Sequence, residues 1–449
     1  MSFLSPGKGT LRFVPKPLRS ALQSIIDPVR GRLLWIEQVP DRLRPARIAA
    51  TGRWLRHIAA TIHARRRRKK VSVAVDASAL WVTRTGIGWY LTRLLTELAS
   101  REDLDLRLYG ERLFIDPSAP AADVDVPSGA AIDLVRYLVP DDLIIERRWL
   151  TRRLRRLEPL LVAADRSRVV FVPNFVPPRP FRFMRGALVA TVHDLTYKNF
   201  PWTLHADTLR SLARHLDRTL VRARLVLTDS DAVGSELLRY GKCRPDALRV
   251  IHLGPRQLRV NEGRLPPGIP ARYALHVGTF EPRKNLPMLL RAWQQLHDVE
   301  HVVLPLVLCG APGWHRHELD ALLSEGEAAG WLMNLGYVLD ADLAALYRHA
   351  AFVCCPSLYE GFGLPVLEAM AAGTPVVASD IPVHREVAGD AAVLLKPDQP
   401  AEWAAAVAAL ARDETRLGEL AQRGKRQAAR FSWQRTAEQT AAAFLEAAG

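Results

Sequence analysis

The sequence predicts an α/β protein made of two doubly wound, Rossmann-like domains that face each other across a cleft. Three observations support this. The chain has 449 residues, enough for two domains. Short apolar runs alternate with longer amphipathic segments in two separate series. A Pro- and Gly-rich stretch at 261–270 divides the two series and is typical of a linker.

The first series begins after a basic N-terminal extension (residues 1–70) and defines a predicted domain over 71–260. A buried strand is expected at 71–75, with a helix after it at 89–98. Further strands are expected at 168–172, 187–192, 225–228 and 248–252. Their apolar character is continuous rather than alternating, as a parallel sheet covered on both faces requires.

The second series defines a predicted domain over 261–430. Strands are expected at 273–277, 302–308, 352–355, 375–378 and 392–395, and a helix at 286–296. The last segment, 431–449, is expected to form a helix that packs on either domain. Ligands of such sheets bind beyond the carboxyl ends of the strands, so the residues that follow each strand are the candidates for a site.

Composition narrows the class of protein. Hydrophobic residues make up 49% and charged residues 24%, which is typical of a folded globular enzyme. The sequence contains no apolar run long enough for a transmembrane helix and no signal-peptide core. The four cysteines lack the spacing of a metal site and three lie in or at the end of apolar runs, so we expect buried thiols in a reduced, cytoplasmic protein.

Two features of the first domain are candidates for ligand binding. Gly86 and Gly88 lie in a turn after the first strand, where glycines allow backbone N–H groups to approach an anion; an ordinary tight turn is the alternative. His193 follows the strand at 187–192 and is suited to donate to a sugar hydroxyl or phosphate. A hydrogen-bonded core histidine is the alternative.

The segment after the strand at 273–277 carries two adjacent cations, Arg283 and Lys284. Asn285 is expected to cap the following helix, and Pro287 fits its first turn. Cations beside a helix N-terminus favour a diphosphate.

A second segment, 356–373, points to the same kind of ligand. Glu360 and Glu368 lie eight positions apart on either side of a glycine-containing loop, and Pro365 marks the start of a helix. The N–H groups of Gly363, Leu364 and Val366 are expected to face a phosphate. One carboxylate would serve the ribose and the other the sugar. The loop residues expected to line this site are Gly361, Phe362, Gly363 and Leu364.

Residues 356–377 resemble the paired-glutamate motif of the retaining glycosyltransferases of the GT-B fold, family GT4. The resemblance extends from about Val71 to the C-terminus and includes Gly86 to Gly88, His193 with Asp194, and residues 281–285. It implies an enzyme that transfers a sugar from a nucleotide-sugar donor to an acceptor.

The resemblance also implies a role for each matching position. Glu368 would bind the donor ribose, Glu360 the transferred sugar, and Lys284 with Arg283 the diphosphate. His193 would lie near the reacting sugar. Gly86 and Gly88 would cover the diphosphate, and Tyr337 and Val338 would approach the base. Many relatives have an arginine where this chain has Thr279, and Arg283 is its expected substitute.

The leaving nucleoside diphosphate would be stabilised by the charges of Arg283, Lys284 and a helix N-terminus, without a metal or other cofactor. Retention of configuration is what the resemblance to the family implies. The donor is expected to be GDP-mannose, with UDP-hexoses and dTDP-rhamnose left open. A sugar-nucleotide 2-epimerase of the same fold is the alternative enzyme, and the spacing of Glu360 and Glu368 disfavours it.

The basic extension holds almost all of the excess charge. Residues 1–70 contain 17 Lys and Arg against 3 Asp and Glu, a net +14 of the total +15. A nearly neutral body argues against a nucleic-acid-binding protein. With its Trp and Leu residues the extension favours an anionic membrane surface, and a nucleic-acid arm or a poorly ordered tail is the alternative. We therefore expect an enzyme peripheral to the inner face of the cytoplasmic membrane, acting on a glycan or a lipid-linked glycan.

Overall fold

The structure is a computed structural model. It describes residues 70–80, 86–109, 131–132, 166–177, 181, 184–204, 206–256, 264–299, 304–313 and 317–449. The basic extension up to Lys69 and a second basic cluster at 147–156 lie outside the described residues.

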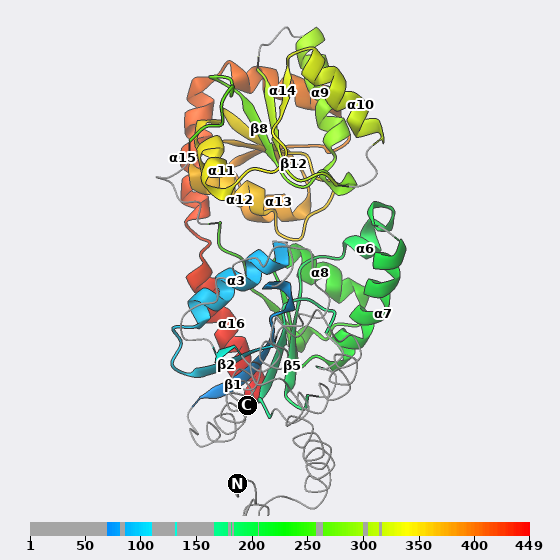
Figure 1. The fold of residues 1–449 in the computed structure, drawn as a ribbon, viewed down its shortest axis with the longest axis vertical. Helices are drawn as coiled ribbons and strands as arrows, with labels where there is room; N and C mark the ends of the chain where they lie inside the picture. Colours follow the sequence, from blue (N-terminus) through cyan, green and yellow to red (C-terminus); the bar gives the residue numbers. More distant parts are fainter. Residues whose placement is uncertain are drawn as a thin grey trace, which may run out of the picture. The chain divides into compact units, whose positions relative to one another are not determined.

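The first domain contains a seven-stranded parallel sheet of order β3-β2-β1-β4-β5-β6-β7 (Figure 1). Its strands are β1 (Val71–Asp76), β2 (Leu104–Tyr109), β3 (Ala131–Ile132), β4 (Val169–Val172), β5 (Ala187–Val192), β6 (Leu225–Thr228) and β7 (Leu248–Val250). Its helices are α3 (Gly86–Leu98), α6 (Thr196–Asn199), α7 (Ala206–Arg222) and α8 (Asp231–Tyr240). Short 3-10 turns occur at Ser78–Leu80, Pro201–Thr203 and Pro245–Ala247.

The second domain contains a six-stranded parallel sheet of order β10-β9-β8-β11-β12-β13. Its strands are β8 (Ala274–Val277), β9 (Leu306–Cys309), β10 (Leu332–Asn334), β11 (Phe352–Cys355), β12 (Val376–Ser379) and β13 (Ala392–Leu395). Its helices are α9 (Leu286–Asp298), α10 (His317–Ala328), α11 (Asp340–His349), α12 (Leu364–Ala372), α13 (Pro382–Ala388), α14 (Pro400–Ala411) and α15 (Glu414–Ala428), and Pro282–Lys284 is a 3-10 turn. Both sheets have the strand order of a Rossmann fold, so the predicted fold class is confirmed.

The strands that sequence analysis missed are β2, β3 and β10. β2 alternates apolar and polar residues, and only its apolar positions are fully buried, so a search for continuous apolar runs passes over it. β9 and β12 begin one residue after Pro305 and Pro375, because proline has no N–H to donate to a neighbouring strand.

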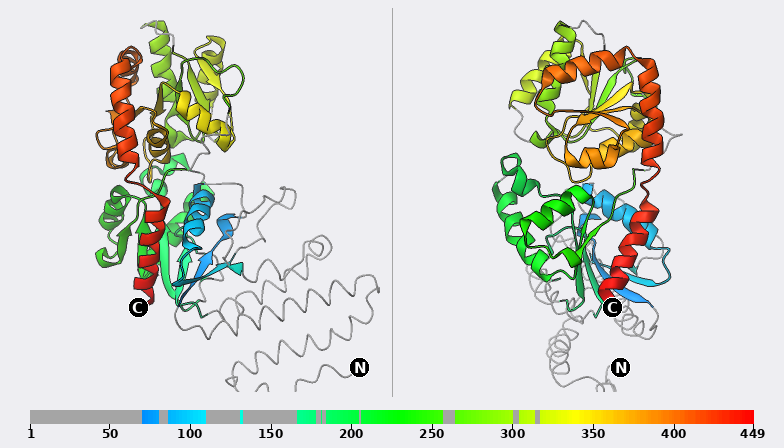
Figure 2. Two further views of the ribbon diagram at one scale, coloured as in Figure 1. Left: turned by 90° about the vertical axis from the view of Figure 1, so that its left-hand side faces the viewer. Right: turned by 180° about the vertical axis from the view of Figure 1, so that it is seen from behind.

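Each strand of the second sheet contributes alternate residues to two different cores. Ala274 and Phe352 pack with helices α9, α10 and α14, whereas Leu275 and Val353 pack with α11, α12 and α13. Helices therefore cover both faces of the sheet (Figures 1 and 2). This arrangement explains why the strand sequences are apolar at every position.

The C-terminal helix, α16 (Trp433–Ala448), packs against α3 and the first sheet. The Trp433 indole donates to the carbonyl of Pro255 at 2.9 Å, and the Phe444 ring lies 5.0 Å from that of Phe171. A Cβ on Gly254 would lie 2.4 Å from the backbone nitrogen of Trp433, so glycine permits this close approach. In Figures 1 and 2 the helix, in red, runs beside the strands of the first sheet.

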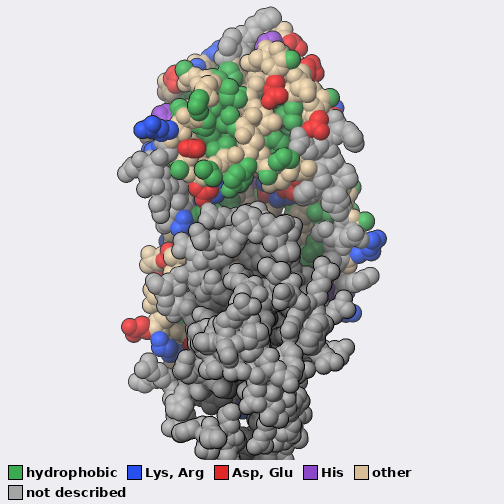
Figure 3. Space-filling model, viewed as in Figure 1, with side chains coloured by type: hydrophobic (Ala, Val, Ile, Leu, Met, Phe, Trp, Pro, Cys, Tyr) green, Lys and Arg blue, Asp and Glu red, His purple; other side chains and the backbone are tan. Residues whose placement is uncertain are grey.

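No helix among the described residues is long and apolar enough to cross a membrane. The face of the second domain in Figure 3 has hydrophobic side chains gathered at its centre and single charged side chains towards its edge.

All four cysteines are buried as free thiols, as the sequence predicts.

Candidate active site

The strand order of the second sheet reverses between β8 and β11, and the loops that follow these two strands meet there. The N–H of Leu358 donates to the carbonyl of Arg283 at 2.8 Å. The two segments that sequence analysis selected separately therefore form one structure.

The centre of this structure is the carboxylate of Glu360, which is only 8% exposed. Lys284 Nζ lies 2.5 Å from Oε1, Ser357 Oγ donates to the same oxygen at 2.7 Å, and Arg283 Nη1 lies 2.7 Å from Oε2. Burial alone would raise the pKa of Glu360, but the two cations outweigh it and hold that pKa far below its usual range. Glu360 is therefore ionised at neutral pH.

Arg283 lies between two carboxylates. Its Nε is 2.7 Å from Glu281 and its Nη1 faces Glu360. Burial opposes its charge, but these carboxylates prevail and raise the pKa of the guanidinium further. Arg283 thus holds Glu360 in place, and the contact of Arg283 with a phosphate stays a prediction. Thr279, at the position where the resemblance implies an arginine in many relatives, is exposed.

The expectation that the Asn285 side chain caps α9 is wrong. Asn285 occupies the N-cap position of α9, but its side chain makes no capping bond. It adopts the left-handed conformation (φ 58°), and its amide donates to the carbonyls of Pro356 and Pro397 at 3.1 and 2.6 Å. Asn285 therefore ties the two ligand-facing loops together, which local capping rules do not anticipate.

The N-terminus of α12 lies at the end of the loop that contains Glu360. Gly363 is its N-cap, with φ 82°, a conformation that favours glycine. The N–H of Val366 donates to the carbonyl of Gly363 at 3.0 Å, so the expectation that it faces a phosphate is wrong. The N–H of Leu364, the first helical residue, has no acceptor within its own helix and suits an anion.

Glu368 lies one turn further along α12 and is 7% exposed. The Tyr347 hydroxyl donates to its Oε2 at 2.8 Å. Burial raises the pKa of Glu368 although the nearby Arg256 guanidinium opposes the shift. Arg256 in turn pairs with Asp340 and stacks over Trp89, 4.6 Å from its ring centroid.

These contacts connect the start of α3 to Glu368. Gly86 is the first residue of α3 and Gly88 is buried within it, and Trp89 follows directly. Neither glycine has a positive φ, so their helical conformation is open to other residues. Tyr337, 64% exposed, and Val338 lie on the loop after β10, and their approach to the base stays a prediction.

His193 follows β5, and both of its ring nitrogens are engaged. Nδ1 lies 2.6 Å from the Asp229 carboxylate and Nε2 lies 2.8 Å from the Pro173 carbonyl. Burial alone would lower the pKa of His193, but the charge and hydrogen bond of Asp229 raise it. Both partners are acceptors, so the two contacts favour the protonated ring, in which both nitrogens donate.

Gly361 lies directly against His193. A Cβ on Gly361 would lie 2.1 Å from the His193 carbonyl oxygen, and Ser230 Oγ donates to the Gly361 carbonyl at 2.7 Å. The structure therefore places the glutamate loop of the second domain beside the strand ends of the first.

Sequence reasoning missed two histidines near Glu360 and Lys284. His276, within β8, donates to the Cys354 carbonyl at 2.9 Å, and burial with Lys284 nearby lowers its pKa to about 4. His384 on α13 packs against Gly363, where a Cβ would lie 3.1 Å from its ring. Neither lies in a recognisable motif, because each reaches the site only through packing.

A further link is made by Glu386 of α13, which also escaped sequence analysis. Its carboxylate accepts from the N–H groups of Asp231 and Ala232, at 2.8 and 2.9 Å, and from His252 at 2.7 Å. It thereby caps α8 of the first domain. The Asp231 carboxylate lies close enough to His252 and Glu386 for the three side chains to hold a metal ion. Both Glu386 oxygens, however, already accept hydrogen bonds.

Beside Glu360 lies a cavity of about 600 Å³ lined by both domains. Its walls include the aromatic rings of Phe200 and Tyr359, 5.4 Å apart, together with polar Asn199 and Glu236. Aromatic faces and hydrogen-bonding groups of this kind suit a polar organic ligand.

Residues 267–430 match the family model of the glycosyl transferases group 1. The chain is 34% identical over 377 residues to O-antigen chain mannosyltransferase B of Escherichia coli, covering 80% of this chain and 96% of that protein. This chain belongs to the glycosyl transferases group 1. It is also 34% identical over 281 residues to the MMP alpha-(1->4)-mannosyltransferase of Mycolicibacterium hassiacum, covering 58% of this chain and 65% of that protein.

Solved glycosyltransferase structures share the two-domain fold. Sucrose-phosphate synthase from Thermosynechococcus elongatus superimposes with a TM-score of 0.62 at 18% identity, covering 84% of this chain and 99% of that one. HepE from Anabaena, solved with UDP and glucose, gives 0.60 at 18% identity, with the same shares of the two chains covered. The protein is therefore a glycosyltransferase with the GT-B fold, as predicted.

Proposed function

We propose that this glycosyltransferase transfers mannose from GDP-mannose, with retention and without a metal, to a polysaccharide or lipid-linked oligosaccharide. The observation that carries the proposal is the buried Glu360 held by Lys284 and Arg283 at the N-terminus of α12.

Lys284 and α12 are suited to the donor diphosphate. A lysine ammonium has three donors, and the contact with Glu360 uses one of them. The N–H of Leu364 and the positive end of the α12 dipole add neutral donors to an anion site. Negative charge that develops on the leaving diphosphate would meet these groups in a largely buried environment.

Glu360 and Glu368 have opposite electrostatic environments, which suits different parts of one donor. Glu360 is held ionised by its two cations, so it accepts hydrogen bonds from sugar hydroxyls and is a poor proton donor. Glu368, with its raised pKa and Tyr347 partner, is suited to ribose hydroxyls. In its protonated form, His193 would contribute positive charge near Gly361.

Mannose and its acceptor class are proposed from the two relatives named above as mannosyltransferases, one of them for O-antigen chains. The cavity beside Glu360 would receive the acceptor glycan. A cytoplasmic location, and contact of residues 1–70 with an anionic membrane face, are further parts of the proposal. The nearly neutral body continues to argue against nucleic acid as a partner.

A thermal-shift screen with GDP, UDP, dTDP, ADP and their sugar conjugates tests the donor. A nucleotide at 100 times its Kd stabilises the fold by about 2.7 kcal/mol, a readily measured shift. We expect selective stabilisation by GDP-mannose that is lost in Glu368→Ala. Selective stabilisation by another nucleotide would overturn the GDP assignment.

Turnover experiments test the chemistry. With acceptor present, NMR of the product should show an α-mannosyl linkage, and EDTA should leave the rate unchanged. Loss of activity with EDTA that only a divalent metal restores would overturn the metal-free mechanism. Conversion of the donor without any acceptor would instead indicate an epimerase.

A further inference from the structure

His276 in strand β8 is only 1% exposed, and one of its ring nitrogens has no partner. Nδ1 lies 2.9 Å from the Cys354 carbonyl, which is an acceptor, so Nδ1 carries the proton and Nε2 keeps a lone pair. Nε2 is buried, and no described residue forms a hydrogen bond with it. An unpaired buried acceptor costs free energy in the folded state, which suggests that Nε2 has a partner at another stage of the reaction.

The His276 ring is neutral. Burial is the main cause that lowers the pKa of His276 to about 4; the bond to the Cys354 carbonyl opposes this shift, and the charge of Lys284 adds to it. Near neutral pH, Nε2 is therefore an acceptor without charge.

Lys284 lies beside this nitrogen. A Cβ on Gly278 would lie 3.6 Å from His276 Nε2 and 3.5 Å from Lys284 Cε, so the ring and the lysine side chain border the same small space. The Lys284 ammonium has three N–H donors, and its contact with Glu360, 2.5 Å away, uses one of them. A buried acceptor without a partner and a buried cation with donors to spare are therefore neighbours.

We propose that His276 is a positioning residue for the donor: its Nε2 accepts a hydrogen bond from the Lys284 ammonium when the diphosphate is bound. This inference rests on the proposed function, in which Lys284 holds that diphosphate. The three N–H donors then have three acceptors, namely Glu360, a phosphate oxygen and Nε2. Because His276 is neutral, it directs the ammonium without cancelling the positive charge that a phosphate requires, as a second carboxylate would.

Two substitutions separate the roles of the two ring nitrogens. His276→Asn keeps a donor near the Cys354 carbonyl but has no atom at the place of Nε2, whereas His276→Gln keeps an acceptor near that place and loses the donor. Isothermal titration of the full chain with GDP and GMP compares them. His276→Asn should weaken GDP about tenfold, as loss of one hydrogen bond to a charged group does, and GMP by less than about twofold, since GMP lacks the second phosphate. His276→Gln should bind GDP as wild type does.

A role confined to the fold predicts the opposite order, because the bond to the Cys354 carbonyl is lost in His276→Gln and kept in His276→Asn. Tight binding of GDP by His276→Asn, or equal weakening of GDP and GMP, would overturn the proposal. Failure of the proposed function looks different, since the wild-type chain itself would then gain no affinity from the second phosphate. If the thermal-shift screen selects another base, its diphosphate and monophosphate replace GDP and GMP.

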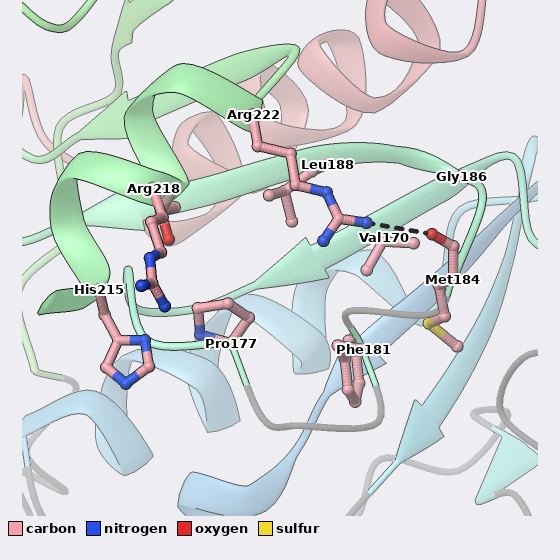
Figure 4. Close-up of a pocket in the computed structure, with 10 residues that line it drawn as sticks. Val170, Pro177, Phe181, Met184, Gly186, Leu188, His215, Arg218 and Arg222 are labelled. Carbon is pink, nitrogen blue, oxygen red and sulfur yellow. Dashed lines mark hydrogen bonds between the residues drawn. The ribbon is translucent and has the colours of Figure 1, made fainter. Parts of the chain in front are cut away.

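Thr219→Val in the first domain controls for the loss of a buried hydrogen bond. Thr219 Oγ1 donates to the Phe175 carbonyl at 2.8 Å, as His276 donates to that of Cys354. Thr219 lines a cavity of about 250 Å³ between α7 and strands β4 and β5 (Figure 4), and none of the described residues that line it belongs to the candidate active site. This variant should lose stability in thermal unfolding and bind both nucleotides as wild type does. Weaker GDP binding by Thr219→Val would show that loss of stability alone explains the effect of His276→Asn.

NMR of the wild-type chain labelled with 15N at histidine gives a measurement that does not depend on the folding of a variant. The signal of His276 Nε2 should move upfield when GDP binds, because an unprotonated ring nitrogen does so when it accepts a hydrogen bond. A signal that saturating GDP leaves unmoved would contradict the proposed contact with Lys284.

Discussion

Glu360 is a buried carboxylate between buried Lys284 and partly exposed Arg283, so its charge contributes to folding as well as to the site. Glu360→Gln leaves Lys284 and Arg283 without their shared partner, which should reduce the free energy of unfolding by about 3–5 kcal/mol at pH 7. Urea unfolding measures this. Glu414→Gln, which removes an exposed carboxylate paired with Arg272, should cost less than about 1 kcal/mol.

The same variant carries a pH signature. Because the folded pKa of Glu360 lies well below the ordinary 4.5, its stabilisation is fully present above pH 4.5 and is lost as the pH falls below it. The difference between wild type and Glu360→Gln should therefore shrink by about 1.4 kcal/mol per pH unit below 4.5. A difference that stays constant from pH 7 to pH 3.5 would show that Glu360 is not held ionised.

Glu368 is expected to bind the nucleotide. Because burial raises its pKa, we expect the fold to tolerate a neutral residue at this position. Glu368→Gln should weaken nucleotide binding about 10- to 150-fold, the value of one hydrogen bond to a charged group. Tyr347→Phe, which removes only the hydroxyl that orients Glu368, should weaken it less. Isothermal titration with the selected nucleotide compares them, and an unchanged Kd in Glu368→Gln would refute its assignment to the ribose.

At this scale the sequence predicts residue types better than contacts. The spacing of Glu360, Glu368 and Lys284 indicated a common site, and the structure brings Glu360 and Lys284 together. The sequence did not predict that Arg283 would hold Glu360 in place, because the two residues are 77 positions apart in the chain. His276 and His384 enter the site through packing, for which no local pattern exists.

Among the elements, α8 and α13 are joined by a helix cap that crosses from one domain to the other. Glu386→Ala removes the acceptor for two N–H groups of α8 and should lower stability by about 1–2 kcal/mol. This cap also joins the two domains beside Gly361. Its loss should therefore lower kcat/KM as well, by up to about tenfold, which corresponds to a loss of about 1.4 kcal/mol of transition-state stabilisation.

Asp413→Ala provides the matched control. Asp413 caps α15 within the second domain, by accepting from the N–H of Arg416 at 2.8 Å. Its loss should cost about 1 kcal/mol and leave kcat/KM unchanged. Equal kinetic effects of the two variants would show that the Glu386 cap has no part in the reaction.

Elements were predictable where their residues carry a periodic signal. Buried strands such as β5 and β11 were identified because both faces of the sheet are covered. β2 escaped because its partly exposed positions are polar, and β10 because it has only three residues. A cap such as Glu386 lies 155 residues from the N–H that it accepts from, so no local rule reveals it.

At the scale of the whole molecule, α16 completes the core of the first domain although it follows the second in sequence. Phe444 is fully buried beside Phe171, so Phe444→Ala should destabilise the first domain by about 3–5 kcal/mol. Leu445→Ala, at a neighbouring position that is partly exposed, should change stability by less than about 0.5 kcal/mol. Limited proteolysis followed by mass spectrometry should show earlier cleavage between Val71 and Val250 in Phe444→Ala, while residues 267–430 stay protected and nucleotide still stabilises them. Equal protection of both domains in this variant would show that α16 is not needed to hold the first sheet together.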